Sequence, residues 1–185
     1  MRYRRQITIV LAIIAVTALT VIGIVLWQVE KQYKFNPYKN DKYHFSLRYP
    51  SDWSIGEQMP ILAAAFLSPL ENKMDNFKEN VNIVVQDLKE NPLSLDEYSE
   101  TAIKQMKAVF ELNMKILDQG PTYLSGRPAY RLIYLGKAGK WDYKFMYVWT
   151  IVNDKAYQFN FTALSTTYND YIRIAKKMMR SFKIY

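Results

Sequence analysis

The longest hydrophobic pattern in the chain lies near its start, where residues 7–27 are apolar apart from three threonines and one glycine. About 20 apolar residues is the length with which a helix spans the roughly 30 Å hydrocarbon core of a bilayer. Arg2, Arg4 and Arg5, in the basic tail of residues 1–6, favour a cytoplasmic N-terminus under the positive-inside rule. The pattern therefore predicts an uncleaved transmembrane signal anchor that crosses the cell membrane once and carries an extracytoplasmic domain.

Cleavage of this segment is an alternative, because Val16-Thr-Ala18 has the small residues of a cleavage site. The apolar run continues without a charge to Trp27, however, and this length favours an anchor over the shorter core of a signal peptide. Four lysines between residues 31 and 42 oppose the charge bias of the tail, but long domains are exported largely regardless of their charge.

The anchor is followed by a predicted linker, residues 28–37, and then by one domain, residues 38–185. Asn36-Pro37 and Asn40-Asp41 favour turns at this boundary. Strict alternation of apolar and polar residues predicts a half-buried strand over residues 43–49, with His44 on its polar face. Apolar runs at residues 61–68 and 81–88 predict two further strands, joined by a polar, mobile loop over residues 70–80.

Ser94-Leu-Asp-Glu97 is a capping box and predicts the start of a helix that ends near Asn113. The residues spaced to form its buried face are Leu95, Tyr98, Ala102, Met106, Val109 and Phe110. A second helix begins near Tyr168, and its predicted buried face consists of Tyr168, Tyr171, Ile172, Ala175, Met178 and Met179, with Phe182 packing past its end.

Further strands are predicted between the two helices. They cover residues 114–119, ended by Gly120-Pro121, then residues 129–135, 141–152 and 157–163, with turns at residues 125–128 and 153–154. The strand over residues 141–152 is apolar on both faces, and such a strand is normally covered on both sides. The order of elements predicts an α+β fold with one central, mainly antiparallel sheet and helices on both faces.

Aromatic residues of one parity, from Trp141 to Trp149, form a ladder along that strand. Packing in the core under a helix explains such a ladder better than stacking on a ligand does. A ligand-stacking role would require that one face of the ladder stays exposed.

The formal net charge of +8 becomes 8 − 3 = +5 when the three arginines of the tail are left out. The cations are dispersed rather than clustered, which does not favour nucleic acid as a partner. The chain has no cysteine, and this excludes disulfides, thiol catalysis and cysteine-based zinc sites.

Candidate chemistry is sparse. His44 is the single histidine, and one histidine without cysteine is a poor basis for a transition-metal site. Glu71, Asp75 and Glu79 could hold Ca²⁺, but their spacing does not match an EF-hand and a solvated loop is the simpler interpretation. No nucleophile elbow, Ser-x-x-Lys pair or phosphate loop occurs in the sequence, so no catalytic residue, metal or cofactor is predicted.

A series of short phrases resembles the PsbP-like family. The phrases are Tyr43-x-Phe-Ser-Leu-x-Tyr-Pro-x-x-Trp53, Phe66-x-Ser-Pro69, Val81-Asn-Ile-Val-Val85, Ser94-Leu-Asp-Glu-Tyr98, Gly126-x-Pro-Ala-Tyr130, Asn153-Asp-Lys-Ala-Tyr157 and Ser181-Phe-Lys-Ile184. The resemblance implies an α-β-α sandwich and a domain that acts by binding rather than by chemistry. Membrane-attached prokaryotic relatives are the closer comparison, because the extrinsic photosystem II subunit that names the family has no anchor of its own.

These observations lead to three functional hypotheses. The first is a non-catalytic, membrane-anchored domain that binds an extracytoplasmic protein or an anionic envelope polymer. Its predicted basic binding edge consists of Arg127, Arg131, Lys137, Lys140 and Lys144, which flank one hairpin. The alternatives are a module that binds a small ligand or Ca²⁺ and, more remotely, a hydrolase that uses a pair of carboxylates.

Overall fold

The computed structural model describes residues 33–56, 61–110 and 114–185, and residues 34–185 form one compact unit. The predicted tail, the anchor of residues 7–27 and the first half of the predicted linker lie outside the described residues. Within the described ranges, no helix combines the length and the hydrophobicity that a membrane span requires.

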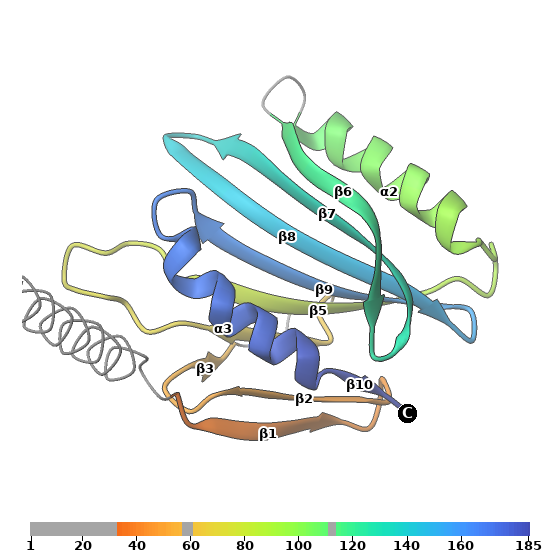
Figure 1. Cartoon of the computed structure of the whole chain (residues 1–185), viewed down its shortest axis with the longest axis horizontal. Helices are drawn as coiled ribbons and strands as arrows, with labels where there is room; N and C mark the ends of the chain where they lie inside the picture. The colour runs from red at the N-terminus through yellow and green to blue at the C-terminus, as the bar shows by residue number, and fades with distance from the viewer. Residues whose placement is uncertain (1–32, 57–60, 111–113) are drawn as a thin grey trace, which may run out of the picture. The chain divides into compact units, whose positions relative to one another are not determined.

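The described elements are two antiparallel sheets and two helices (Figure 1). The large sheet has the order β3-β4-β5-β9-β8-β7-β6. Its strands are β3 (Ser54–Ile55), β4 (Ala64–Leu67), β5 (Asn80–Asp87), β6 (Lys115–Leu124), β7 (Arg127–Ala138), β8 (Trp141–Val152) and β9 (Lys155–Leu164). The small sheet has the order β1-β2-β10, with β1 (Phe35–Asn40), β2 (Phe45–Pro50) and β10 (Lys183–Ile184), and the helices are α2 (Leu95–Phe110) and α3 (Tyr168–Ser181).

One face of the large sheet packs against α2 through the aromatic ladder of β8. Phe145 and Trp149 are buried in a core cluster with Tyr98 of α2 and Tyr134 of β7. The indole Nε1–H of Trp149 donates a hydrogen bond to Ser99 Oγ at 2.8 Å, and this bond ties the centre of the sheet to the helix. The interpretation of the ladder as core packing is therefore confirmed from Tyr143 to Trp149, whereas Trp141 is not part of this cluster.

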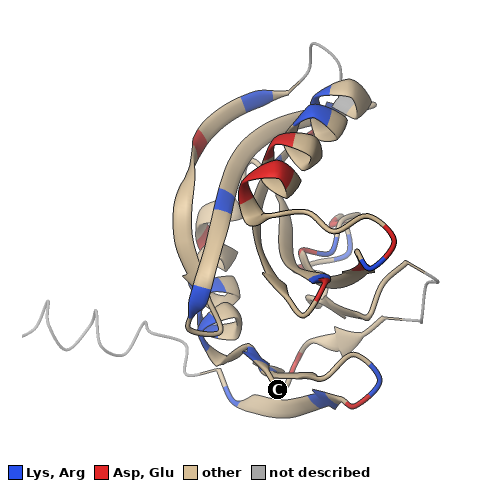
Figure 2. Cartoon of the chain, turned by 90° about the vertical axis from the view of Figure 1, so that its right-hand side faces the viewer, with Lys and Arg blue, Asp and Glu red and all other residues tan. Residues whose placement is uncertain are grey.

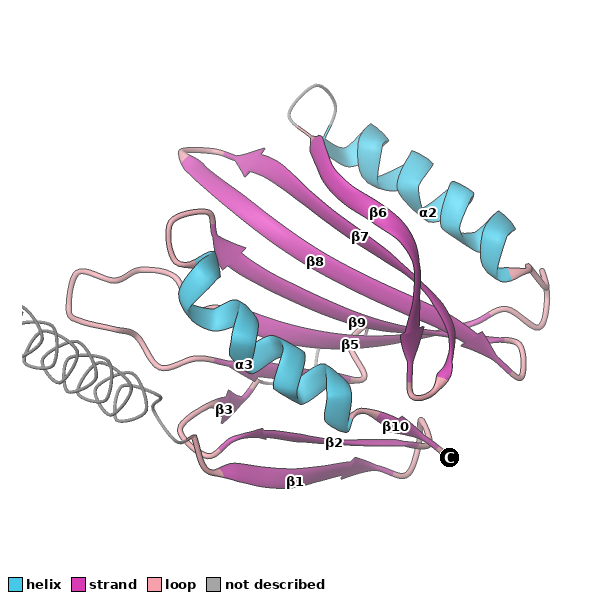
Figure 3. Ribbon diagram, in the orientation of Figure 1, coloured by secondary structure: helices cyan, strands magenta, loops and turns pink. Residues whose placement is uncertain are grey.

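The opposite face of the large sheet packs against α3, which also contacts β2 of the small sheet (Figure 3). Phe161 of β9 packs on Tyr168 with ring centroids 5.4 Å apart. Phe182, just past the end of α3, contacts Phe45 of β2 and Phe159 of β9. The α+β class and the antiparallel pairing are confirmed, and the expectation that Phe182 packs past the helix end is confirmed as well.

The small sheet is the main departure from the predicted fold, because the strands do not all join one central sheet. β1 begins at Phe35, so it includes the last residues of the predicted linker, and the turn expected at Asn36-Pro37 is wrong. β1 pairs with β2 from Phe35↔Pro50 to Asn40↔Phe45. Its residues show no strict alternation, which is why periodicity did not identify it as a strand.

Other strands begin or end at residues that differ from the predicted ones. β6 continues through Gly120-Pro121 to Leu124 instead of ending there. It is an edge strand, where a proline is tolerated because one side of the backbone needs no partner. The strand predicted over residues 61–68 is reduced to β4. His44 is not on a strand face, since it lies in the β1–β2 turn with φ of 53°.

The helix predictions were correct in their starts and in most buried positions. The capping box forms as expected, because Ser94 N–H donates to Glu97 Oε2 at 2.8 Å and Glu97 N–H donates to Ser94 Oγ at 3.2 Å. Val109 was wrongly placed on the buried face, since it is 78% exposed. In α3, Ile174 rather than Ile172 is fully buried. The predicted end of the first helix, near Asn113, lies outside the described residues.

Candidate functional site

A groove with a volume of about 680 Å³ lies over the small sheet and the C-terminal segment. Its lining residues come from β1, β2, the end of α3 and the C-terminal segment: Pro37, Tyr38, Lys39, Ser46, Leu47, Arg48, Ser181, Lys183 and Tyr185. We call it the C-terminal groove. Its lining contains three cationic side chains and no aspartate or glutamate.

The register of the small sheet sets the three cations side by side. Lys39 of β1 and Lys183 of β10 both pair with Ser46 of β2, one from each side, and Pro37 pairs with Arg48. Neighbouring strands lie about 4.8 Å apart, and paired residues point to the same face of a sheet. The inward residues Phe45 and Leu47 are buried, so the cations occupy the outer face. Figure 2 shows Lys and Arg segments on the β1–β2 hairpin and beside the C-terminus.

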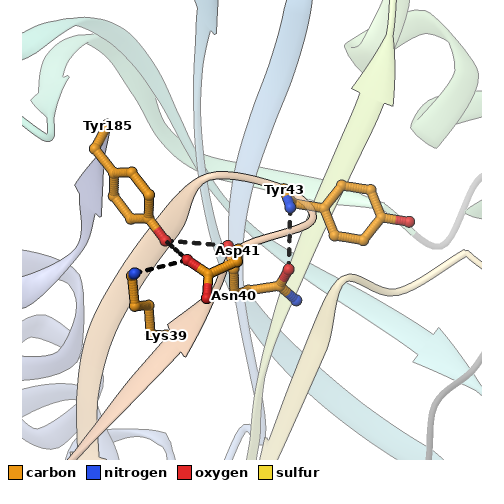
Figure 4. A network of polar contacts seen from close by, with 5 residues as sticks. All are labelled: Lys39, Asn40, Asp41, Tyr43 and Tyr185. Carbon is orange, nitrogen blue, oxygen red and sulfur yellow. Dashed lines mark hydrogen bonds and ion pairs between the residues drawn. The ribbon is translucent and has the colours of Figure 1, made fainter.

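A polar network holds one end of the groove in place (Figure 4). The Lys39 ammonium lies 2.7 Å from Asp41 Oδ1, and the Tyr185 hydroxyl donates to the same oxygen at 3.0 Å. Asn40 Oδ1 accepts a hydrogen bond from Tyr43 N–H, which fixes the turn. Tyr185 N–H donates to the carbonyl of His44, so the C-terminus is fastened to the β1–β2 turn.

This network shifts the pKa of each partner. The hydrogen bond from Lys39 lowers the pKa of Asp41, and the hydrogen bond to Asp41 raises the pKa of Lys39. Partial desolvation, followed by the hydrogen bond to Asp41, raises the pKa of Tyr185. Lys39 and Asp41 are therefore both charged at neutral pH. Among the three groove cations in the described residues, Lys39 is the one that forms an ion pair with a carboxylate side chain.

A second cleft, of about 350 Å³, adjoins the groove on the other side of β10 and shares Lys183 with it. Its lining residues are Tyr123, Ser125, Gly126, Met179, Arg180, Phe182 and Lys183. The β6–β7 turn that forms one wall has positive φ at Ser125 and Gly126, the conformation that a tight hairpin of this kind requires. Ser125 Oγ accepts from Ile184 N–H at 2.9 Å, which holds this turn against the C-terminal segment.

The chemistry of the groove suits the binding of anionic groups. Arg48 presents a guanidinium that is partly held by a hydrogen bond to the carbonyl of Phe35. The exposed rings of Tyr123 and Tyr185 offer flat apolar surfaces beside the cations. Ser181 Oγ accepts from Arg48 N–H and donates to the carbonyl of Met178, so this hydroxyl serves the fold. Ionic contacts and stacking are what this surface offers.

The structure distributes the predicted basic binding edge over separate surfaces. Arg127 and Lys137 lie at opposite ends of β7, about 30 Å apart for a strand of this length. Arg131 lies between them and forms an ion pair with Asp118 at 2.6 Å. Lys140 lies at the β7–β8 turn, with its ammonium 4.8 Å from the centre of the Trp141 ring.

Lys144 belongs to the same end of β7 and β8 as Lys137 and Lys140. Its ammonium lies 4.2 Å from the centre of the Tyr168 ring, a cation–π contact. The structure thus brings Lys137, Lys140 and Lys144 to one end of the domain and leaves Arg127 at the other. The role of these five residues in binding stays a prediction.

The three acids considered for Ca²⁺ face different partners. Asp75 accepts from the N–H groups of Glu71 and Phe77, and these bonds lower its pKa. Glu71 Oε1 accepts from the Tyr171 hydroxyl, and the buried Glu79 accepts from the hydroxyls of Ser68 and Thr167. Among the described residues, no group of three metal-ligating side chains occurs, and this includes His44.

The groove residues Lys39, Lys183 and Tyr185 were missed by reasoning from the sequence. Ser46 and Arg48 were placed correctly on the polar face of a strand, but their neighbours from α3 and β10 are 133 or more residues away along the chain, as the Arg48–Ser181 bond illustrates. No local pattern reports such a pairing. The signal that was available is the concentration of Lys and Tyr at both ends of the domain.

Comparisons with known proteins agree with this fold. The PsbP family model matches residues 33–184. The chain belongs to the PsbP family. The resemblance inferred from the sequence phrases is confirmed, and the family match begins close to the first described strand of this PsbP domain. No curated protein matches the chain significantly.

Solved structures similar to this PsbP domain share its fold at low sequence identity. Cyanobacterial PsbP (CyanoP) of Synechocystis has a TM-score of 0.62 and 13% identity, covering 85% of this chain and 96% of its own. LpqN, described as involved in cell envelope biogenesis of Mycobacterium tuberculosis, has a TM-score of 0.59 and 11% identity, with coverages of 84% and 92%. The Ran-binding protein Mog1p of Saccharomyces cerevisiae has a TM-score of 0.57 and 7% identity, with coverages of 83% and 96%.

Proposed function

We propose that this PsbP-family chain is a membrane-anchored, non-catalytic domain that binds a partner with anionic groups, a protein or an envelope polymer, outside the cytoplasm. The partner occupies the C-terminal groove. The anchor of residues 7–27 and the charge of the tail support the location. Tethering raises the local concentration near the membrane, so a groove of modest affinity is sufficient.

The observation that carries the proposal is the row of Lys39, Arg48 and Lys183 on the outer face of the small sheet. Cations placed on adjacent strands and held by a fixed register lose little conformational freedom when they meet a matching row of anions. The C-terminal groove is open on one side, which suits an extended peptide segment or polymer chain better than a small molecule, because small molecules usually bind in enclosed pockets.

The fold neighbours are consistent with a binding role. Mog1p is described as a Ran-binding protein, and LpqN is described as involved in cell envelope biogenesis. Fold alone does not transfer function, so these names support the class of the proposal and not its partner. The row of cations, which belongs to this chain, supplies the specific hypothesis.

The test is a comparison of two variants of the full-length chain in cells whose envelopes are cross-linked before solubilisation. Arg48→Glu combined with Lys183→Glu replaces two cations of the groove by anions. Each exposed charge pair contributes about 0.2–1 kcal/mol, so the reversal of two lowers recovery of the partner about tenfold. The matched control is Lys107→Glu on the exposed side of α2.

The material recovered is separated into protein and polymer fractions, which identifies the class of partner. Loss of one species with the groove variant and its retention with the control supports the proposal. Equal recovery with the groove variant and the control contradicts it.

A second candidate function is binding of a small polar ligand in a cleft of about 290 Å³ beside α2. Tyr98 lines this cleft, and its hydroxyl accepts from Gln158 Nε2 at 2.8 Å and donates to Gln86 Oε1 at 2.9 Å. This chain of polar groups could orient a ligand. A rise in melting temperature with simple sugars or metal ions, lost in Tyr98→Phe, would support this function over the first.

A further inference from the structure

One loop of the domain presents apolar side chains to solvent at the tip of a fixed turn. Met74 is 86% exposed and Leu70 is 47% exposed. The turn is held by hydrogen bonds from Met74 N–H to Asn72 Oδ1 at 2.9 Å and from Asp75 N–H to the carbonyl of Asn72 at 3.2 Å. Met74 and Leu70 place two exposed apolar side chains on one short loop, and apolar side chains that gather on a surface mark an interaction site.

The loop of residues 69–79 is also fastened to the body of the domain. Phe77 packs against Tyr143 of β8 with ring centroids 5.2 Å apart. Glu71 accepts the hydroxyl of Tyr171 of α3 at 3.0 Å. Met74 therefore projects from a supported base and keeps its direction relative to the sheet.

Contacts link this loop to the residue at which the compact unit begins. Tyr171, which binds Glu71, packs on Trp53 with ring centroids 6.3 Å apart. Trp53 follows a turn in which Ser51 N–H donates to the carbonyl of Lys34 at 2.8 Å. The loop, the β2–β3 turn and the start of β1 therefore lie at one end of the domain, as Figure 1 shows.

The β7–β8 turn lies at the same end and adds lysines and a tryptophan. Phe77 of the loop contacts Tyr143, two residues after Trp141, and Lys140 covers the ring of Trp141. We call this surface the proximal face and define it by Leu70, Lys73, Met74, Lys78, Lys137, Lys140 and Trp141. Its lysines are exposed, whereas Trp141 is half-buried.

The length of the intervening chain limits the distance from this end to the membrane. Only residues 28–33 separate the predicted anchor from Lys34, and seven peptide units span at most about 25 Å. A strand as long as β8, with 12 residues, measures about 40 Å. The chain between Trp27 and Lys34 is therefore shorter than such a strand, and its length limits how far Lys34 can lie from the predicted anchor.

We propose that the proximal face contacts the lipid surface, with Met74 and Leu70 inserted at the boundary between headgroups and acyl chains. This inference rests on the anchor of the proposed function. Tryptophan favours the membrane interface, and lysine side chains extend from it toward the headgroups. The carboxylates of Glu71, Asp75 and Glu79 accept hydrogen bonds from the protein, and their negative charges partly offset those of the lysines.

This contact orients the domain. Since acids and lysines of the loop nearly balance in number, apolar insertion carries the contact and anionic lipid strengthens it only modestly. The C-terminal groove shares no lining residue with the proximal face, so binding of a partner there does not compete with this contact.

The test uses the absence of cysteine in the chain, which allows clean labelling of one introduced thiol. The full-length chain with Met74→Cys is labelled with nitrobenzoxadiazole and reconstituted into phosphatidylcholine vesicles, with and without phosphatidylglycerol. The expected result is a shift of the emission to shorter wavelength, together with stronger emission than a label in water gives, because the label leaves water for the boundary between headgroups and acyl chains. Val109→Cys, at a residue that is 78% exposed on α2, is the matched control and keeps the emission of a label in water.

Two outcomes overturn the inference, and they are distinguishable. If the chain floats with the vesicles and resists alkaline extraction but the label at Met74 behaves like that at Val109, the proximal face does not contact lipid although the anchor holds. If the chain is extracted at alkaline pH, the anchor itself fails, and the proposed function fails with it. Leu70→Ser in the Met74→Cys background is expected to lower the emission, since it removes the neighbouring apolar side chain.

Discussion

Replacement of Trp149 by phenylalanine tests how the large sheet is held to α2. Trp149 is fully buried, and its indole N–H donates to Ser99 Oγ at 2.8 Å, while Ser99 Oγ donates in turn to the carbonyl of Leu95 at 2.6 Å. The substitution removes one buried hydrogen bond, which contributes about 1 kcal/mol. It also leaves a cavity where the larger ring lay, which costs about 1–1.5 kcal/mol at roughly 24 cal/mol per Å³. The free energy of unfolding is therefore expected to fall by about 2–2.5 kcal/mol.

The assay is urea unfolding, and separately thermal unfolding, of a fragment of residues 34–185, the compact unit, monitored by near-ultraviolet circular dichroism. For a domain of this size, the melting temperature is expected to fall by about 5–9 °C. Ser99→Ala leaves the indole N–H of Trp149 without its acceptor and is expected to cost about 1–3 kcal/mol.

Because the two residues share one bond, the double variant Trp149→Phe with Ser99→Ala is expected to lose about 1 kcal/mol less than the sum of the single losses. Strict additivity of the two substitutions, or a loss below about 0.5 kcal/mol for Trp149→Phe, would refute the assignment of this bond as the link between sheet and helix.

Three further predictions concern local interactions. Ser94→Ala removes a hydroxyl that caps α2 and is expected to lower stability by about 1 kcal/mol in urea unfolding, whereas Ser94→Asp restores most of it. Lys39 lowers the pKa of Asp41 in the folded domain. The stability that this pair adds is therefore present above the ordinary carboxyl pKa and is lost as the pH falls through the pKa of the folded state. Carboxyl NMR titration should show that the midpoint of Asp41 rises in Lys39→Met and is unchanged in the control Lys42→Met. Burial raises the pKa of Tyr168 to about 12. The contribution of this shift to the stability of the domain is complete below the ordinary tyrosine pKa and is lost as the pH rises through about 12. Ultraviolet titration up to pH about 11 should therefore give the same phenolate signal for wild type and Tyr168→Phe.

Elements with strong local signals were predictable from the sequence. The capping box at Ser94, the paired-turn residues Asn153 and Asp154, and the ladder from Tyr143 to Trp149 each have a physical cause within a few residues, and each formed as expected. The turn at Asn153-Asp154 has positive φ at both residues, which asparagine and aspartate tolerate best among non-glycine residues.

The small sheet and the C-terminal groove were not predictable, because they depend on contacts between distant segments. β1 carries a proline and no alternating pattern, and β10 has only two residues. Both are defined as strands by their pairing with β2, which aligns Lys39, Ser46 and Lys183. The predicted basic binding edge was chosen from positions near one another on a single hairpin, so it could not include residues that three separate strands align.

Photo-cross-linking in intact cells tests the central claim, that the anchored domain binds an anionic partner through the C-terminal groove. Benzoylphenylalanine at position 185 replaces one aromatic ring of the groove by another, and the same residue at position 107 on α2 is the control. We predict one dominant cross-linked species from position 185, accessible to protease added outside the cytoplasmic membrane and lost when Arg48→Glu and Lys183→Glu are introduced. The same species from both positions, or one that is unaffected by the charge reversal, would contradict the claim.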